Sequence, residues 1–169
     1  MPAETTTLSA GARIAWTAQS RRALAQLTRL LAPYTPRRFE QAEGQLLQQQ
    51  ITARYQRAQS EGHLLAQTLP RWEALASALN SVLASLPQSQ LSHRWILLPQ
   101  DAEVRGVFDL PIDALPERAA ALLRWDGNTV LLAAPSLDHG VLLDCSVEDD
   151  DRVVLTLEHW FNRDPSHGS

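Results

Sequence analysis

The chain has 169 residues and a net charge of -4, and 44% of its residues are hydrophobic. This length suits one domain with a substantial core, or a small domain with a helical extension, and the composition excludes a disordered chain. The single cysteine, Cys145, excludes an intramolecular disulfide and a zinc site built from several cysteines. The N-terminus has no signal-peptide pattern, and no apolar run approaches the roughly 20 residues that span a bilayer. We therefore expect a cytoplasmic protein without a membrane span.

Charge is divided unevenly along the chain. All ten aspartates lie at or after Asp101, so that nine arginines and five glutamates give +4 up to Gln90, whereas six arginines and fourteen acids give -8 beyond it. The sequence contains no lysine. We attribute this to a GC-rich, bacterial genome, because arginine and lysine both serve as solvated surface charges. The uneven charge predicts two segments with different structures.

Residues 10–87 are predicted to be helical. Apolar residues recur in the first part at three- and four-residue steps, which gathers them on one helical face: Ile14, Ala18, Leu24, Leu27 and Leu31. Pro33 and Pro36 predict that this helix ends near residue 32. A third helix is predicted to begin near Pro70, with an apolar face that includes Trp72, Leu75, Leu79, Val82, Leu83 and Leu86.

A second helix is predicted from Arg37 to about Gln67, and it is unusually polar. Its thin apolar row consists of Leu47, Ile51, Tyr55 and Ala58. Such a row buries little surface, so we expect a partner for this helix, either the first helix in an antiparallel hairpin or a second copy of the chain. The polar side chains form a candidate protein interaction surface, made of Arg37, Arg38, Gln45, Gln48, Gln49, Arg54, Tyr55 and Arg57.

The pattern changes to short apolar runs after residues 87–90. Strands are predicted at residues 93–98, 104–110, 129–134, 141–146 and 153–160, with a short helix beginning near Asp113 and Pro116. The Asp126-Gly127 pair predicts a hairpin turn. The expected fold is α+β, with an antiparallel sheet of four to five strands and one short helix in residues 91–161. The ends, residues 1–9 and 162–169, are predicted to be flexible.

Two alternative chemistries involve the predicted sheet. Cys145 and His139 are the residue types of a nucleophile and its base, and His139 with His159 could ligate a metal. However, the carboxylate of Asp144 next to the cysteine raises a thiol pKa, and no diagnostic metal-ligand spacing is present. A small hydrolase-like or metal-dependent domain would need His139, Cys145 and His159 to converge within about 10 Å. The run Ser136 to Gly140 is more simply interpreted as a turn.

The leading functional hypothesis is a non-enzymatic protein that binds another protein or a second copy of itself. It includes an adaptor, a chaperone or immunity-type inhibitor, and a subunit of a multiprotein assembly. No catalytic residue, cofactor or metal is expected, because no motif for one is present. A further alternative is nucleic-acid binding through the Arg- and Gln-rich N-terminal helices, although a pI of about 5.7 disfavours it.

Overall fold

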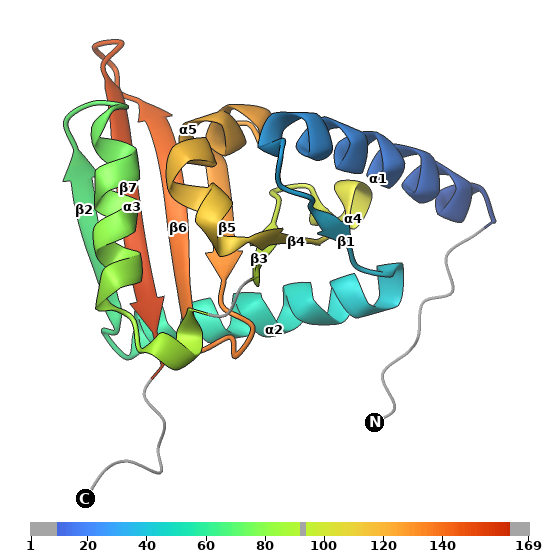
Figure 1. The fold of residues 1–169 in the computed structure, drawn as a ribbon, viewed down its shortest axis with the longest axis horizontal. Coiled ribbons are helices and arrows are strands. Elements are labelled where there is room, and N and C mark those ends of the chain that lie inside the picture. Colours follow the sequence, from blue (N-terminus) through green and yellow to red (C-terminus); the bar gives the residue numbers. More distant parts are fainter. Residues whose placement is uncertain (1–9, 92–93, 163–169) are drawn as a thin grey trace, which may run out of the picture.

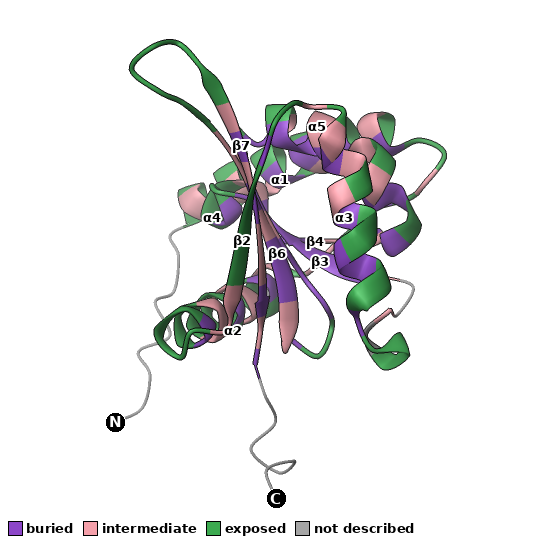
Figure 2. Ribbon diagram, turned by 90° about the vertical axis from the view of Figure 1, so that its left-hand side faces the viewer, coloured by how far each residue is buried: buried purple, intermediate pink, exposed green. Residues whose placement is uncertain are grey.

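A computed structural model describes residues 10–91 and 94–162. The fold is α+β, as predicted, and consists of an antiparallel sheet with helices on both faces (Figures 1 and 2). The helices are α1 (Ala10–Leu31), α2 (Gln41–Ser60), α3 (Ala74–Ser85), α4 (Ala102–Arg105) and α5 (Leu115–Trp125). Short 3₁₀ turns lie at Gln88–Gln90 and Ile112–Ala114.

The sheet has seven strands in the order β1-β4-β3-β5-β6-β7-β2. Their bounds are β1 (Arg37–Arg38), β2 (Leu64–Leu69), β3 (Arg94–Leu98), β4 (Phe108–Pro111), β5 (Thr129–Ala133), β6 (His139–Val147) and β7 (Val153–Phe161). All neighbouring strands are antiparallel. The sheet therefore has two more strands than the predicted maximum of five, because β1 and β2 come from the segment that was expected to be helical.

Both faces of the sheet are packed, but to different degrees. The core face is covered by α1, α3 and α5, and its buried strand residues include Leu97, Phe108, Val130, Val141 and Leu157. The opposite face, which we call the α2 face, buries a smaller cluster under α2 and α4. Figure 2 shows α3 and α5 on one side of the sheet and α2 on the other. Burying one large apolar side chain stabilises the fold by roughly 1.5–3 kcal/mol, so most of the hydrophobic stabilisation lies on the core face.

A close contact between a glycine and a tryptophan shapes the α2 face. Gly140 on β6 lies opposite Trp160 on β7, and the Trp160 side chain is fully buried. A Cβ atom at position 140 would lie 2.2 Å from the indole ring. Only glycine therefore lets the ring cross the neighbouring strand and fill the space beneath α2.

The prediction of one helix from Arg37 to Gln67 is wrong at both ends. Arg37 and Arg38 pair with β4, and the helix ends at Ser60. Gly62 has a φ of +73°, a backbone conformation that ends a helix and that glycine adopts without strain. Leu64 to Leu69 then pair with β7 along their whole length. Pairing with a distant strand thus overrides the local helical preference.

The predicted antiparallel hairpin of the first two helices is also wrong. The buried residues of α1, such as Leu27 and Leu31, belong to the core face, whereas Ile51 and Ala58 of α2 belong to the α2 face. The main packing partners of α1 are α4 and α5, and those of α2 are β7 and α4. The sheet and the short helix α4, and not α1, bury the thin apolar row of α2.

Two turns also differ from the prediction. The predicted strand 104–110 begins as α4, and the positive φ of Gly106 precedes the shorter strand β4. The Asp126-Gly127 pair follows α5 and connects it to β5, so it forms no hairpin. The residues with positive φ here are Gly127 and Asn128, and this left-handed backbone ends helix α5.

The carboxylate of Asp126 is buried at this helix end. It accepts hydrogen bonds from the Gln100 backbone N–H at 3.0 Å and from Arg105 Nη1 at 3.2 Å. Burial raises the pKa of Asp126 to about 7, although the hydrogen bond from Gln100 and the charge of Arg105 oppose the rise. Arg105 also lies over the Trp125 ring, 5.0 Å from its centroid. These contacts fix α5 to the loop after β3.

Some predicted features fall outside the described residues, namely residues 1–9, residues 163–169 and His93. Asn162, which was assigned to the flexible tail, is buried, and its backbone N–H donates to the Asp138 carbonyl oxygen at 2.8 Å. The prediction of a flexible tail is therefore wrong at this residue. Within the described part of the chain, no helix has the length and apolar character to cross a membrane.

Candidate protein interaction surface

Helix α2 is held on the sheet by one apolar stripe. Ile51 and Ala58 are fully buried, and they belong to the same cluster as Trp160. Tyr55 meets the edge of the Trp160 ring, with centroids 6.4 Å apart. The spacing of these residues places them on one helical face, so the opposite face of α2 points to solvent.

Two polar contacts beside this apolar stripe also hold α2 on the sheet. Tyr55 donates a hydrogen bond to Glu158 Oε2 at 2.6 Å, and Arg54 Nη1 lies 3.1 Å from Asp138 Oδ1. Burial, followed by the hydrogen bond to Glu158 and the charge of Glu158, raises the pKa of Tyr55 to about 12. Both acidic partners come from the acidic half of the chain, whereas Arg54 and Tyr55 come from the basic half. These contacts therefore connect the two halves.

The solvent side of α2 is an uncharged and partly apolar surface. We call Gln45, Leu46, Gln49, Gln50 and Ala53 the outer face of α2, and all five side chains are exposed. Leu46 is 54% exposed, which is high for a leucine on a helix packed against a sheet. No charged residue occurs between Glu43 and Arg54. A surface of this composition loses less favourable hydration than a charged surface does when another protein covers it.

The eight residues predicted as an interaction surface have three different environments. Gln45, Gln49 and Arg57 are exposed on α2, and Arg57 pairs with Glu61 at 2.9 Å. Gln48, Arg54 and Tyr55 are half-buried against the sheet side. Arg37 and Arg38 belong to β1; Arg37 is exposed, whereas Arg38 donates to Ser20 Oγ at 2.7 Å and lies over Trp16.

Leu46 was missing from the predicted surface, although the sequence contains a signal for it. The apolar row of the helix includes Leu47 but not its neighbour Leu46, which is turned away by about 100°. A leucine outside the buried row must face solvent or a partner. This criterion identifies Leu46 from the amino-acid sequence alone.

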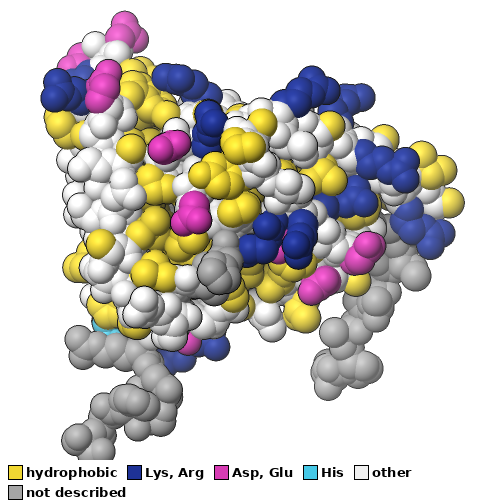
Figure 3. All heavy atoms as spheres, viewed as in Figure 1, with side chains coloured by type: hydrophobic (Ala, Val, Ile, Leu, Met, Phe, Trp, Pro, Cys, Tyr) yellow, Lys and Arg dark blue, Asp and Glu magenta, His cyan; other side chains and the backbone are white. Residues whose placement is uncertain are grey.

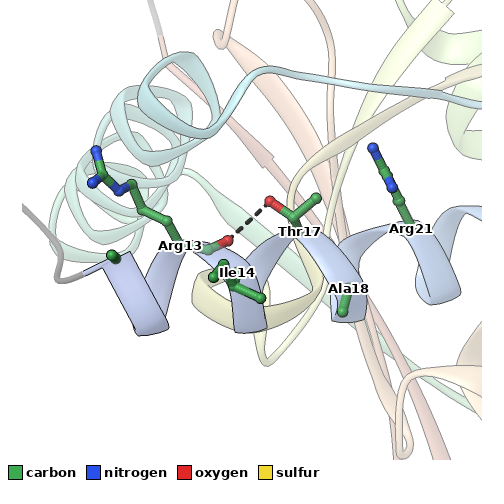
Figure 4. A pocket seen from close by; sticks show the side chains of 6 residues that line it. Arg13, Ile14, Thr17, Ala18 and Arg21 are labelled. Atoms are coloured by element: carbon green, nitrogen blue, oxygen red, sulfur yellow. Dashed lines mark hydrogen bonds between the residues drawn. The ribbon is translucent and has the colours of Figure 1, made fainter.

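A second exposed surface lies on the N-terminal half of α1. A shallow depression there is lined by residues of this one helix, among them Arg13, Ile14, Ala18 and Arg21, as Figure 4 shows. Ile14 is 71% exposed, and α1 contains no acidic residue. Arginine side chains gather over this end of the molecule in Figure 3. The surface combines positive charge with an apolar row.

The histidines of the alternative hypotheses lie at one end of the core face. The rings of His139 and His159 are stacked with centroids 6.0 Å apart, and Phe161 lies 6.0 Å from His159. Burial lowers the pKa of both histidines; Asp138 opposes this for His139, and His139 adds to it for His159. Within the described structure, His139 Nδ1 and His159 Nε2 are buried without a hydrogen-bond partner.

Cys145 is not part of this cluster. It lies on the same strand as His139 but six residues further on, a separation of roughly 20 Å at the usual rise of a strand. Burial and then the charge of Asp144 raise the pKa of the Cys145 thiol, so the thiolate that a nucleophile needs is disfavoured. The structure therefore does not bring together His139, Cys145 and His159.

The carboxylates near these histidines have other partners. Asp138 pairs with Arg54, Glu158 accepts from Tyr55, and Asp144 accepts a hydrogen bond from Thr129 at 2.6 Å. Within residues 10–91 and 94–162, no three His, Cys, Asp or Glu side chains converge as a metal site requires. In comparisons with known proteins, no family, no curated protein and no solved structure matches this chain.

Proposed function

We propose that this protein is a non-enzymatic, cytoplasmic binding protein that recognises another protein through the outer face of α2. The observation that carries the proposal is the exposed Leu46 within an uncharged face of a helix whose opposite face is fixed to the sheet. The proposal includes an adaptor, a chaperone or immunity-type inhibitor, and a subunit of a multiprotein assembly. The roughly 20 Å between His139 and Cys145 supports binding rather than catalysis.

The rigidity of α2 favours such a role. A helix that is already ordered loses little conformational freedom when a partner binds to it. Leu46 provides an apolar anchor for a pocket on the partner, and Gln45, Gln49 and Gln50 can donate and accept hydrogen bonds around it. The matching surface on the partner is therefore an apolar groove with a polar rim, which is a common way of binding a helix.

Matched variants test this proposal. Affinity capture from the native cell identifies candidate partners, and binding is then measured with the purified partner. Leu46→Glu should weaken this binding at least about tenfold, which corresponds to about 1.4 kcal/mol. Val147→Glu provides the control, because Val147 is also an exposed apolar residue, at 65%, but lies on β6. A partner that binds the Leu46→Glu variant as well as the wild type would overturn the proposal.

Nucleic-acid binding through α1 is the second candidate. It is favoured by the four arginines of this acid-free helix, of which Arg13, Arg21 and Arg22 are exposed on its projecting half. Contacts to phosphates would make the binding sensitive to salt. Replacing Arg13, Arg21 and Arg22 by Gln should abolish a shift of DNA or RNA at low salt. A shift that these changes leave intact would exclude this candidate.

A further inference from the structure

Strand β2 forms one edge of the sheet, and no strand of the described residues pairs with its outer side. It pairs with β7 on one side and is the last strand in the sheet order. No described residue forms a backbone hydrogen bond with its outer edge. Figure 2 views the molecule toward this edge, and β2 lies in front with exposed residues along most of its length. Leu65 on this strand is 62% exposed.

The hydrogen bonds of β7 show which backbone groups of β2 point outward. The Phe161 N–H donates to the His63 carbonyl oxygen at 3.1 Å, and the Asn162 N–H donates to Asp138 on the opposite side of β7. Backbone groups alternate along an antiparallel strand, so residues 63, 65, 67 and 69 bond to β7. Leu64, Ala66 and Thr68 therefore direct their N–H and C=O groups away from the sheet, which leaves six groups for another strand.

We propose that two copies of this chain pair through β2 in an antiparallel, two-fold symmetric dimer, with Ala66 of one copy opposite Ala66 of the other. In this register Leu64 lies opposite Thr68 of the second copy, and Thr68 lies opposite its Leu64. The three residue pairs form six hydrogen bonds and use all six outward groups of each strand. The result is one continuous sheet across both copies.

The ends of β2 favour this register over its neighbours. A shift by two residues in one direction would place Pro70 in the ladder, and proline has no N–H to donate. A shift in the other direction would require Gly62, whose φ of +73° is not that of a strand. In both cases two of the three pairs remain complete. Of these three registers, the one centred on Ala66 therefore pairs the largest number of outward backbone N–H and C=O groups.

Charge also favours a second copy as the occupant. In a two-fold contact each charged residue near the axis meets its own like charge, which is unfavourable. No charged residue occurs in β2, and none occurs from Ala74 to Leu91, a segment that includes α3. The exposed residues of α3 are Ser77, Asn80, Ser81, Ala84 and Ser85. Figure 3 shows the α3 side of the molecule largely without charge.

The opposite edge of the sheet differs in each of these respects. Strand β1 has two residues, Arg37 and Arg38, and both carry a charge. Short edge strands and charged edge residues are the usual means by which proteins prevent pairing of sheets. One edge is thus protected, whereas the other has the length and neutrality that pairing needs.

Helix α3 leaves room for the exposed leucines of a dimer. It packs over β7 on the core face, one strand away from the edge. The two β7 strands of the dimer would be separated by three strand spacings, which is about 14 Å. The axes of two helices in contact are about 8–10 Å apart, so the two α3 helices above these strands would not collide. The side chains of Leu65 and Gln67 from both copies point to this face and fill the gap between the two α3 helices. Dimerisation would thereby cover Leu65.

The dimer is independent of the proposed function, because the outer face of α2 and the edge of β2 are different surfaces. Sedimentation velocity over about 1–500 µM protein should show a reversible equilibrium between monomer and dimer. Thr68→Lys should raise the dissociation constant at least about tenfold, since it places a charge in the contact. Gln50→Lys adds the same charge on the exposed face of α2 and should leave the equilibrium unchanged.

A cross-linking experiment tests the register without depending on affinity. In a Cys145→Ser background, Ala66→Cys should form a disulfide dimer under mild oxidation, because residues opposite each other in a bonded pair have Cα atoms about 5.5 Å apart. Thr68→Cys provides the control, as its counterparts would lie roughly 13 Å apart along the strands. A monomer at every concentration, a dimer that Thr68→Lys leaves intact, or equal cross-linking at both positions would overturn the two-fold contact.

Discussion

The two faces of the sheet differ in how they are stabilised. The core face is covered by three helices and contains a large and purely apolar cluster. The α2 face is covered mainly by one helix, and its smaller cluster is joined by the hydrogen bond of Tyr55 to Glu158 and the ion pair of Arg54 with Asp138. The core face thus provides most of the stability. The α2 face instead determines where a helix with an exposed, uncharged surface is placed.

The largest expected effect is on the core face. Phe108 is fully buried on β4 and meets the Trp125 ring edge to face, with centroids 6.4 Å apart. Phe108→Ala should lower the free energy of unfolding by about 3–5 kcal/mol, because it removes a large side chain and leaves a cavity. Urea denaturation followed by tryptophan fluorescence would measure it. A loss below about 1 kcal/mol would contradict the assignment of most stability to this face.

The next effect is on the α2 face and comes from overpacking. Gly140→Ala introduces a Cβ atom 2.2 Å from the Trp160 indole, so the ring must move and α2 with it. We expect a loss of about 1–3 kcal/mol, with a change in the near-ultraviolet circular dichroism of the tryptophans. Gly11 is the matched control, since a Cβ atom there would have no neighbour within 4 Å. Gly11→Ala should leave stability within about 0.5 kcal/mol of the wild type.

A smaller effect on stability is expected from the polar contacts of Tyr55 and Arg54 on the α2 face. Tyr55→Phe removes the hydrogen bond to Glu158 and keeps the ring contact with Trp160, so the loss should be about 1 kcal/mol. Arg54→Gln breaks an ion pair whose side chains are 42% and 40% exposed, and solvent screening limits that loss to about 0.5 kcal/mol. Urea denaturation of both variants would measure these losses of unfolding free energy. Equal losses would contradict the expectation that the hydrogen bond of Tyr55 stabilises the fold more than the solvent-exposed ion pair of Arg54 does.

The dependence of stability on pH provides the subtlest comparison. Burial lowers the pKa of His139 and His159 below their ordinary value of 6.5 in the folded protein. The two histidines therefore make their full contribution to the free energy of unfolding above about pH 6.5, and this contribution is lost as the pH falls below that value. His159→Phe should reduce the decline in unfolding free energy between about pH 6.5 and pH 5. An unchanged decline would contradict the buried, neutral state of this histidine.

Asp126 changes the free energy of unfolding in the opposite direction over an overlapping pH range. Its pKa is raised to about 7 in the folded state, so its contribution is complete below its ordinary value of 3.8 and is lost as the pH rises toward 7. Because Asp126 is present in both the wild type and the His159→Phe variant, its effect cancels in their difference. Urea titrations of the two proteins at matched pH values would give that difference.

Elements whose apolar pattern was strong were predicted well. The face of α3 at Leu75, Leu79 and Val82 is buried as expected, and α1 ends at Leu31, close to the predicted residue 32. The predicted strand at residues 129–134 is β5, which is buried on both faces, with Val130 and Leu132 in the core-face cluster and Ala133 in the α2-face cluster. In each case the period of the apolar residues determines both the element and its buried side.

The candidate surfaces were predicted only in part. The polar residues of α2 suggested an interaction surface, but Arg54 and Tyr55 bond to Asp138 and Glu158, which are far away in the sequence. The edge strand β2 was missed entirely, because Leu64 to Leu69 have no alternating pattern and follow a helix directly. Hydrogen bonds to β7 decide the conformation of this segment, and no local pattern records them.

The sequence by itself determined the α+β class and the main amphipathic helices, because these depend on local periodicity and on breaker residues. The tertiary structure decided the rest. It assigned α1 and α2 to different faces, moved β2 from the predicted helical half into the sheet, and separated Cys145 from His139. The physical reason is that strand pairing and burial join residues about 100 positions apart, such as Leu64 and Trp160, whose contact depends on the fold of the whole chain.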